Sequence, residues 1–233
     1  MFTNNGQGVR GDLKAVLRAL LLDTEARDAV LATGNNYGKL REPVLRLTAL
    51  LRAYKVRSLS GLVQVKDESD PGFTIGQVPL GAPSVFNFFR PGYVATGGQA
   101  QARGLVLPEM QITDEVSVAG YANTMTSVLT GGFGRAVRVG TNPLQADLQL
   151  DYSADQALAG DAAALVDSVA GRLLTITPSA GFKSELVAAV NSVVVPALQP
   201  NGSNKAKVDA AKLNRVRVAL LLTVVSPEFL VQK

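Results

Sequence analysis

The sequence predicts an all-α protein: an irregular bundle of seven or eight helices with a long loop region that is rich in glycine and proline and contains phenylalanine. The apolar residues are mostly Ala, Val and Leu, aromatic residues make up 6% of the chain and Trp is absent. This mixture suits helix packing better than a sandwich of aromatic-rich strands. Apolar residues recur at helical spacing in several segments. Glycines and prolines concentrate between residues 57 and 110, which predicts the loop region.

Residues 1–56 are expected to form an N-terminal helical hairpin. Asp12 and Asp23 are good N-cap residues for two helices, and Gly34 ends the second one. Pro43 is tolerated in the first turn of a further helix. Two stripes have the spacing of one helical face: Leu13, Val16, Leu17, Leu20 and Leu21, and then Leu40, Val44, Leu47, Leu51 and Tyr54.

Residues 111–233 are expected to form a C-terminal helical bundle. Helical spacing covers residues 111–129 and resumes after Asp161, after Thr177 with Pro178, and after the polar linker 200–205. Ser226 and Pro227 resemble the cap and first residue of a last short turn that docks Phe229 and Leu230. Between these helices, residues 135–153 are ambiguous, because Leu148, Leu150 and Tyr152 alternate as in a short strand. The glycines at 131, 132 and 134 are interpreted as a helix stop, and no convincing sheet is predicted. The three regions are expected to form one continuous globular unit, itself a fragment of a longer domain.

The composition excludes several kinds of chemistry. The chain has no histidine and no cysteine, so it offers no Ser-His-Asp triad, no thiol nucleophile and no thiolate metal site. The net charge of +4 comes without runs of basic residues or interleaved aromatic residues, and we expect no nucleic-acid partner. The apolar stretches are too short for a membrane span, and no export signal is visible. We expect no cofactor and no metal. Whether this chain alone is an enzyme is left open by the sequence, and the residues present favour the answer that it is not.

The N-terminal segment contains Gly6, Gly8 and Gly11 in the pattern G-x-G-x-x-G. A dinucleotide-binding loop needs a buried strand before it, and the five preceding residues are too few and too polar. A phosphate-binding P-loop needs Lys and Ser or Thr where this chain has Asp12 and Leu13. We therefore interpret the glycines as a turn that leads into a helix capped by Asp12.

Carboxylates are the remaining candidates for a polar site. Asp147, Asp151 and Asp155 are spaced by four residues and leave a calcium site as one hypothesis. The cluster of Asp67, Glu68 and Asp70 does not match the EF-hand pattern. For both groups solvated loop charge is the preferred interpretation. Asp114 and Glu115 are neighbours and would point in different directions on a helix, so they are not expected to act as a pair.

The most distinctive segment is APSVFNFFRPGY, residues 82–93. As a structural element it would be a hydrophobic plug that fixes the loop to the helices, which is the interpretation we favour. As a functional site it would be an aromatic-lined pocket with two polar groups. The candidate interaction segment consists of Phe86, Asn87, Phe88, Phe89, Arg90 and Tyr93.

Four stretches together resemble the bacterial family called domain of unknown function 1800. They are residues 4–27, residues 38–54, residues 82–93 and the closing SPEFLVQK, residues 226–233. Members of that family are typically about twice as long, so the resemblance implies that this chain corresponds to the C-terminal portion. Phe229 stands where the family pattern usually has Tyr. The resemblance also implies an exported parent, periplasmic or extracellular, encoded beside a sulfatase-like protein.

No biochemical activity follows from this resemblance. The leading hypothesis is a helical protein-binding or scaffold module, whose partner is that sulfatase-like neighbour or a second copy of the chain. One alternative is part of a secreted hydrolase whose catalytic groups lie in the N-terminal portion or on a partner. Another alternative is a self-assembling structural protein.

Overall fold

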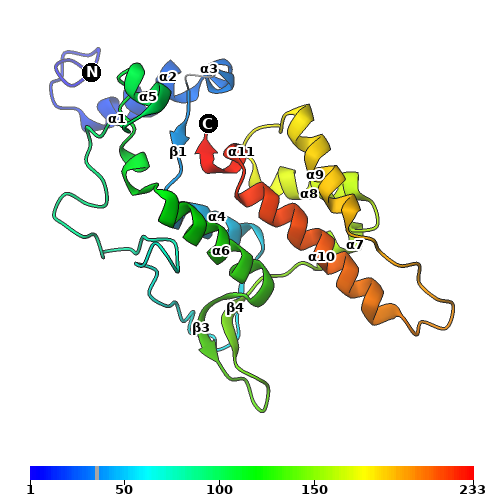
Figure 1. Cartoon of the computed structure of the whole chain (residues 1–233). Helices are drawn as coiled ribbons and strands as arrows, with labels where there is room; N and C mark the ends of the chain where they lie inside the picture. Colours follow the sequence, from blue (N-terminus) through cyan, green and yellow to red (C-terminus); the bar gives the residue numbers. More distant parts are fainter. Residues whose placement is uncertain (35–36) are drawn as a thin grey trace. The chain divides into compact units, whose positions relative to one another are not determined.

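The computed structural model describes residues 1–34 and 37–233, and 48% of the protein is helical (Figure 1). The helices in the described residues are α1 (Leu13–Leu21), α2 (Thr24–Arg27), α3 (Ala29–Thr33), α4 (Pro43–Ala53), α5 (Gly98–Ala102), the 3-10 helix η1 (Pro108–Ile112), α6 (Glu115–Gly131), α7 (Ser153–Leu158), α8 (Ala162–Leu173), α9 (Ala180–Ser192), α10 (Lys205–Val224) and α11 (Pro227–Leu230). The strands are β1 (Lys39–Leu40), β2 (Arg57–Ser58), β3 (Phe133–Val137), β4 (Gln145–Gln149) and β5 (Val231–Gln232). The chain divides into two compact units, residues 1–39 with Lys233, and residues 40–232.

The first unit contains three short helices. The Asp12 carboxylate accepts a hydrogen bond from the backbone N–H of Ala15, 3.1 Å away, and this cap starts α1 as the sequence predicts. Asp23 caps α2 in the same way. The single helix expected after Asp23 is interrupted, because Asp28 adopts an extended backbone and its carboxylate caps α3 instead.

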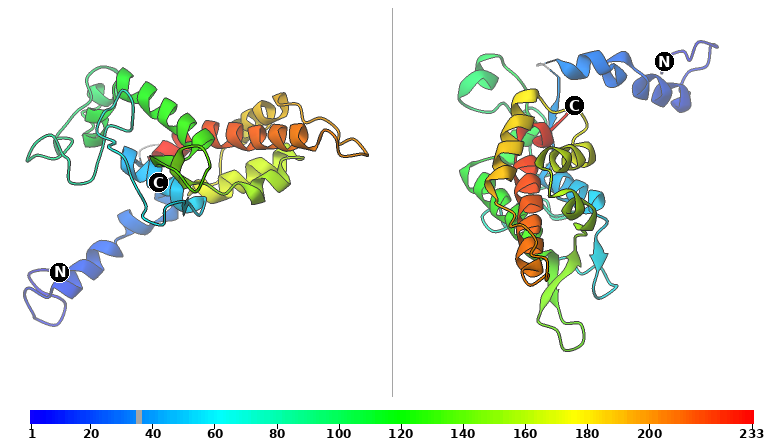
Figure 2. Two further views of the ribbon diagram at one scale, coloured as in Figure 1. Left: turned by 90° about the horizontal axis from the view of Figure 1, so that it is seen from below. Right: turned by 90° about the vertical axis from the view of Figure 1, so that its right-hand side faces the viewer.

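The second unit is built around α10, which packs against α6, α7, α8 and α9 (Figure 2). Helix α4 belongs to this unit and packs against α8. The core is made of side chains from α4, α6, α8, α9 and α10, and its fully buried members include Leu50, Met125, Leu165, Val190 and Leu220. Burying such side chains is the main favourable term in folding, about 1.5–3 kcal/mol for each large aliphatic residue.

Local capping fixes where the helices of this bundle begin. Asp114 and Ser117 form a reciprocal capping box at the start of α6. Asp161 caps α8 as predicted, and Ser226 caps α11, which places Phe229 in the core. Helix α9 begins two residues later than expected, because Ser179 rather than Thr177 supplies the capping oxygen.

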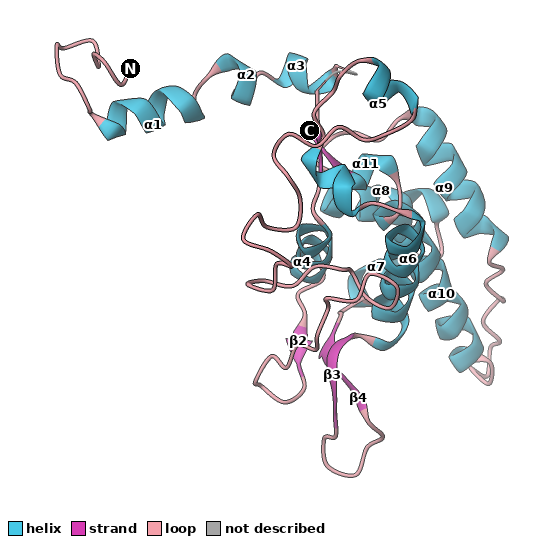
Figure 3. Cartoon of the chain, turned by 60° about the vertical axis from the view of Figure 1, so that its left-hand side comes forward, coloured by secondary structure: helices cyan, strands magenta, loops and turns pink. Residues whose placement is uncertain are grey.

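The all-α prediction is wrong in one respect, because strands β2, β4 and β3 form a three-stranded antiparallel sheet in that order (Figure 3). A further two-stranded sheet pairs β1 with β5. In the larger sheet Leu148 is paired with Ser58 on one side and with Phe133 on the other. The alternating pattern around Leu148 therefore indicated a strand correctly, and the prediction that there is no sheet was wrong.

Gly134 in β3 permits a close contact between this strand and the preceding loop. Its φ is +98°, and a Cβ atom there would lie 2.3 Å from the carbonyl oxygen of Gln64. The next residue, Arg135, donates its N–H to that same oxygen at 2.9 Å. Gly134 therefore allows a close approach of loop and strand backbones. The glycines before it end the helix as predicted, because α6 ends at Gly131 and Gly132 is its C-cap.

Residues 57–110 are mostly loop, as predicted, with β2, α5 and the start of η1 as the regular elements. One contact holds the loop against α6 at Gly120, where a Cβ atom would lie 1.9 Å from the carbonyl oxygen of Pro71. Only glycine permits this approach. No helix in the described residues is long and apolar enough to cross a membrane.

Candidate functional site

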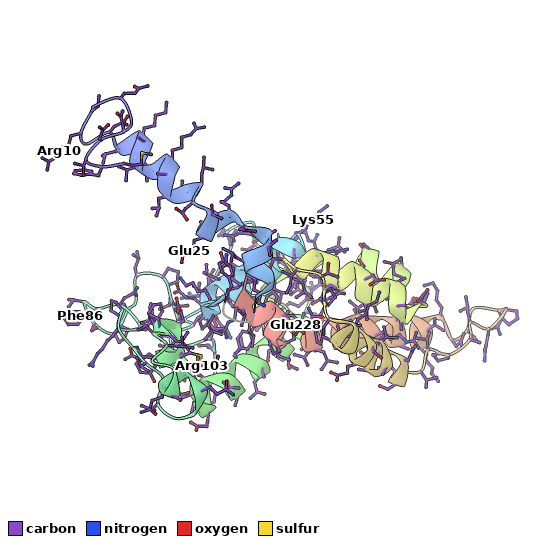
Figure 4. The ribbon with its side chains drawn as sticks, turned by 90° about the horizontal axis from the view of Figure 1, so that it is seen from above. Arg10, Glu25, Lys55, Phe86, Arg103 and Glu228 are labelled. Carbon is purple, nitrogen blue, oxygen red and sulfur yellow. The ribbon has the colours of Figure 1, made fainter. Side chains whose placement is uncertain are left out.

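The predicted interaction segment lies in the long loop between β2 and α5, and its side chains are not packed as a plug. Phe86 is 71% exposed and projects outward from the loop (Figure 4). Phe88, Phe89 and Tyr93 are half-buried, and Arg90 is exposed. None of the three phenylalanines belongs to the described hydrophobic core. The plug interpretation is therefore wrong for Phe86, which is mostly exposed, while Phe88 and Phe89 are half-buried outside the described core.

Hydrogen bonds hold the interaction segment in a fixed series of turns. Ser84 accepts the N–H of Phe86 at its hydroxyl and the N–H of Asn87 at its carbonyl, both at 3.1 Å. Asn87 has a φ of +69°, in the left-handed region that asparagine tolerates. Arg90 donates its N–H to the side-chain oxygen of Gln111, 2.7 Å away, which ties the segment to η1. The exposed aromatic ring is thus presented by an ordered turn.

Other large apolar side chains of the same loop are also exposed. We define the apolar loop surface as Phe73, Leu80, Val85 and Phe86, all of which are more than two-thirds exposed. Scattered exposed apolar residues are normal on protein surfaces, but here four large ones lie within one loop.

Asp147 is buried, so solvated loop charge is the wrong interpretation for it. Its carboxylate accepts hydrogen bonds from the N–H groups of Ser60 and Gln64, both at 2.7 Å, and from the hydroxyl of Ser58 at 2.9 Å. Burial alone would raise the pKa of Asp147, but the hydrogen bonds from Gln64, Ser60 and Ser58 lower it to about 2. The carboxylate shapes the loop after β2.

Asp155 is also buried, and it joins α7 to α4 and α8. It accepts a hydrogen bond from the Tyr54 hydroxyl at 2.7 Å, from the Ser168 hydroxyl at 2.8 Å and from Arg172 at 3.2 Å. The Arg172 guanidinium lies 5.1 Å from the centre of the Tyr54 ring. Burial, and then the hydrogen bond to Asp155, raise the pKa of Tyr54. Every oxygen of this carboxylate is occupied, which indicates a structural network.

The calcium hypothesis joined these two residues with Asp151, which is exposed and accepts the N–H of Ser153, the first residue of α7. Asp147 is bonded to the loop after β2, whereas Asp155 is bonded to Tyr54 and to residues of α8. No group of three acidic residues that could hold a metal ion occurs in the described part of the chain. Asp114 caps α6, and the hydrogen bond from Ser117 lowers the pKa of its carboxyl.

Glu68 differs from its neighbours in the acidic cluster. Asp67 and Asp70 accept hydrogen bonds from nearby N–H groups in the loop, as expected for solvated charge. Glu68 is buried, however, and neither of its carboxyl oxygens has a hydrogen-bond partner. Burial raises the pKa of Glu68 from its usual 4.5 to about 7. No pattern in the sequence marks this residue, because burial is decided by how the loop folds.

The three glycines of G-x-G-x-x-G form the turn that the sequence suggests. All three have positive φ, and the side chain of Asn4 accepts the N–H groups of Gly6 and Gly8 at 2.8 and 3.0 Å. The N–H of Gly11 is bonded to the carbonyl of Phe2. The N–H groups of these glycines, which a nucleotide phosphate would need, are thus already paired within the turn.

Two buried arginines are functional candidates that the sequence reading missed. Arg46 of α4 is 6% exposed and Arg41, just before α4, is 8% exposed. The Nε atom of Arg46 donates to the carbonyl of Arg41 at 2.6 Å, and its guanidinium lies 5.1 Å from the centre of the Tyr121 ring. The Arg41 guanidinium lies 4.8 Å from the centre of the Phe229 ring. Arg46 lies on the buried face of the amphipathic helix α4. A charged residue at such a position is the sequence feature that could have marked it as a candidate.

The comparisons with known proteins support one assignment. No curated protein and no solved structure matches the chain. The family described as "Protein of unknown function (DUF1800)" matches residues 1–231, which is essentially the whole chain, and the protein therefore belongs to this family.

Proposed function

We propose that this protein is a helical protein-binding module and that the apolar loop surface contacts its partner. The observation that carries the proposal is Phe86, which stays 71% exposed although the turn around it is fixed by hydrogen bonds. A rigid turn that presents an aromatic ring loses little conformational entropy on binding. Aromatic anchors of this kind commonly dominate the free energy of protein–protein association.

The carboxylates support this proposal indirectly. Asp147 and Asp155 are each bonded to three groups of the chain, and Asp114 is bonded to the start of α6. These acids therefore have structural roles in the described fold. A partner protein is a better match to the exposed apolar surface than a polar small-molecule substrate.

The test is affinity purification from the native host with the wild-type chain, the Phe86→Ser variant and a matched control. Val194→Ser is the control, because Val194 is an equally exposed apolar residue in the linker between α9 and α10. We expect one protein to be enriched by the wild type and by Val194→Ser, and to be recovered about tenfold less with Phe86→Ser, as for loss of a binding hot spot.

Light scattering on the same three proteins distinguishes a second copy of the chain from a different partner. Self-association that Phe86→Ser weakens would identify a second copy as the occupant of the surface. The proposal fails if Phe86→Ser and Val194→Ser give the same recovery and the same molar mass as the wild type.

A further inference from the structure

A small cavity lies beside Arg46 within the second unit. Its volume is about 120 Å³. Its wall consists of residues of β1, α4, η1, α6 and α11, together with Thr113 after η1, Val225 after α10 and Ile75 of the long loop. The polar residues in its wall are Arg46, Thr113, Ser117 and Tyr121. The rest of the wall is apolar and includes Leu40, Ile75, Ala122 and Leu230. The cavity is distinct from the apolar loop surface defined above.

Arg46 is the one polar residue of this wall whose side chain keeps unused donors. The Tyr121 hydroxyl donates to the carbonyl of Val224 at 2.9 Å. The hydroxyls of Ser117 and Thr113 donate to the carbonyls of Asp114 and Glu109. The Arg46 guanidinium uses Nε for the Arg41 carbonyl. Its two terminal nitrogens have no hydrogen-bond partner in the described residues and remain accessible to solvent at the cavity.

The charge of Arg46 is also uncompensated within the described residues. No ion pair joins Arg46 or Arg41 to an acid there, and each guanidinium instead faces an aromatic ring. Burial lowers the pKa of Arg46, and the nearby positive charge of Arg41 lowers it further. The two like charges repel each other, and an anion beside Arg46 would reduce this repulsion.

The dimensions and chemistry of the cavity restrict that anion. Two free, coplanar donors match the two oxygens of a carboxylate, which arginine binds in a bidentate way. A phosphate would present further charged oxygens to an apolar wall, and the hydroxyls that could serve them are already used. The volume of about 120 Å³ corresponds to about four water molecules, enough for a short chain.

We propose that this cavity binds a carboxylate that carries a short aliphatic chain, with the Arg46 guanidinium as its charge partner. The aliphatic chain contacts the apolar wall at Leu40, Ile75 and Leu230. The source is either a free short-chain acid or the C-terminal residue of a peptide, because both present the same group.

The test uses thermal unfolding of the full chain with butyrate as the probe, at constant ionic strength. Butyramide has the same shape without the charge, and chloride has the charge without the chain. Three variants are compared: Arg46→Gln, the cavity-filling Ala122→Leu, and Arg52→Gln, which removes an exposed arginine from the same helix. Tripeptides that end in valine, with a free or an amidated C-terminus, separate the two sources.

Butyrate at ten times its dissociation constant is expected to raise the ratio of folded to unfolded protein about elevenfold in the wild type and in Arg52→Gln. No such shift is expected in Arg46→Gln or in Ala122→Leu. If Arg46→Gln does not fold, Ala122→Leu decides the question, because it leaves the charge in place and occupies the space. The proposal is overturned if butyramide or chloride acts as well as butyrate, or if any folded cavity variant keeps the full shift.

Discussion

The bundle of α6 to α11 and the loop of residues 59–97 differ in which side chains are buried and in whether a buried acid has hydrogen-bond partners. In the bundle, apolar side chains such as Leu165 and Leu220 are buried, and the buried acid Asp155 has three hydrogen-bond donors. In the loop, apolar side chains such as Phe86 are exposed, while the acid Glu68 is buried without a partner.

The difference shows that burial and hydrogen bonding stabilise the bundle more than they stabilise the loop. The bundle follows the ordinary rules of burial and hydrogen bonding. The loop depends on a few single contacts, such as the approach of Pro71 to Gly120 and the hydrogen bond from Val44 to the side chain of Gln77. An apolar surface and an unpaired acid both reduce stability, and this pattern is common where a surface serves binding.

The largest effect is expected in the bundle, from Asp155→Ala. The change leaves the buried Tyr54 hydroxyl without its acceptor and removes the partner of Arg172, which should lower the free energy of unfolding by about 3–4 kcal/mol. Chemical denaturation would measure the loss. Asp151→Ala is the control, because that exposed acid accepts one hydrogen bond, from the N–H of Ser153, and its loss should cost about 1 kcal/mol or less. Equal losses for the two variants would contradict the structural role of Asp155.

The second effect tests how the loop is attached to the bundle. Gly120→Ala would place a Cβ atom 1.9 Å from the carbonyl oxygen of Pro71, so the loop backbone must move. We expect the free energy of unfolding to fall by about 2–3 kcal/mol, as for overpacked sites. Gly171→Ala in α8 is the matched control, because nothing lies within 4 Å of the added atom. That change should be neutral or slightly stabilising, and a similar loss at both glycines would show that the loop does not pack on α6.

The smallest effect concerns Glu68 and depends on pH. The pKa of Glu68 in the folded protein is about 7, above its usual 4.5, so the folded state binds more protons than the unfolded state between these values. Stability is therefore lost as the pH rises from about 4.5 to about 7, and the loss is complete above pH 7. Glu68→Gln should remove this penalty. The shift corresponds to at most about 3.5 kcal/mol, and because solvent screens part of the charge we expect the variant to be more stable at pH 8 by about 2 kcal/mol.

Thermal unfolding at pH 4.5 and at pH 8 would measure the Glu68 effect. At pH 4.5 the variant and the wild type should be close in stability, because the carboxyl is largely protonated in the folded protein. Asp67→Asn is the control, because Asp67 is exposed and accepts a hydrogen bond from the N–H of Ser69. A Glu68→Gln protein that is less stable than the wild type at pH 8 would show that the carboxylate has a partner.

Much of the helical structure could be predicted from the sequence because helix starts are local. Asp12, Asp161 and Ser226 each cap a helix within three residues of their own position, so the pattern and the structure agree. The split at Asp28 was missed although its signal was also local, since a second capping residue stood inside an apolar pattern. The candidate interaction segment was recognised by its phenylalanines, but its exposure was not.

The sequence by itself determined most of the long helices, several of their caps and the family to which the protein belongs, because these depend on neighbouring residues or on the order of motifs along the chain. Only the tertiary structure decided which polar groups are buried and whether they are paired. Tyr54 and Asp155 are 101 residues apart, and Arg46 meets Tyr121 only after α4 and α6 have packed. Burial depends on segments that are distant in the chain, and for this reason Asp147 and Glu68 carried no sign of their surroundings in the sequence, whereas Arg46 was marked only by its place on an apolar helix face.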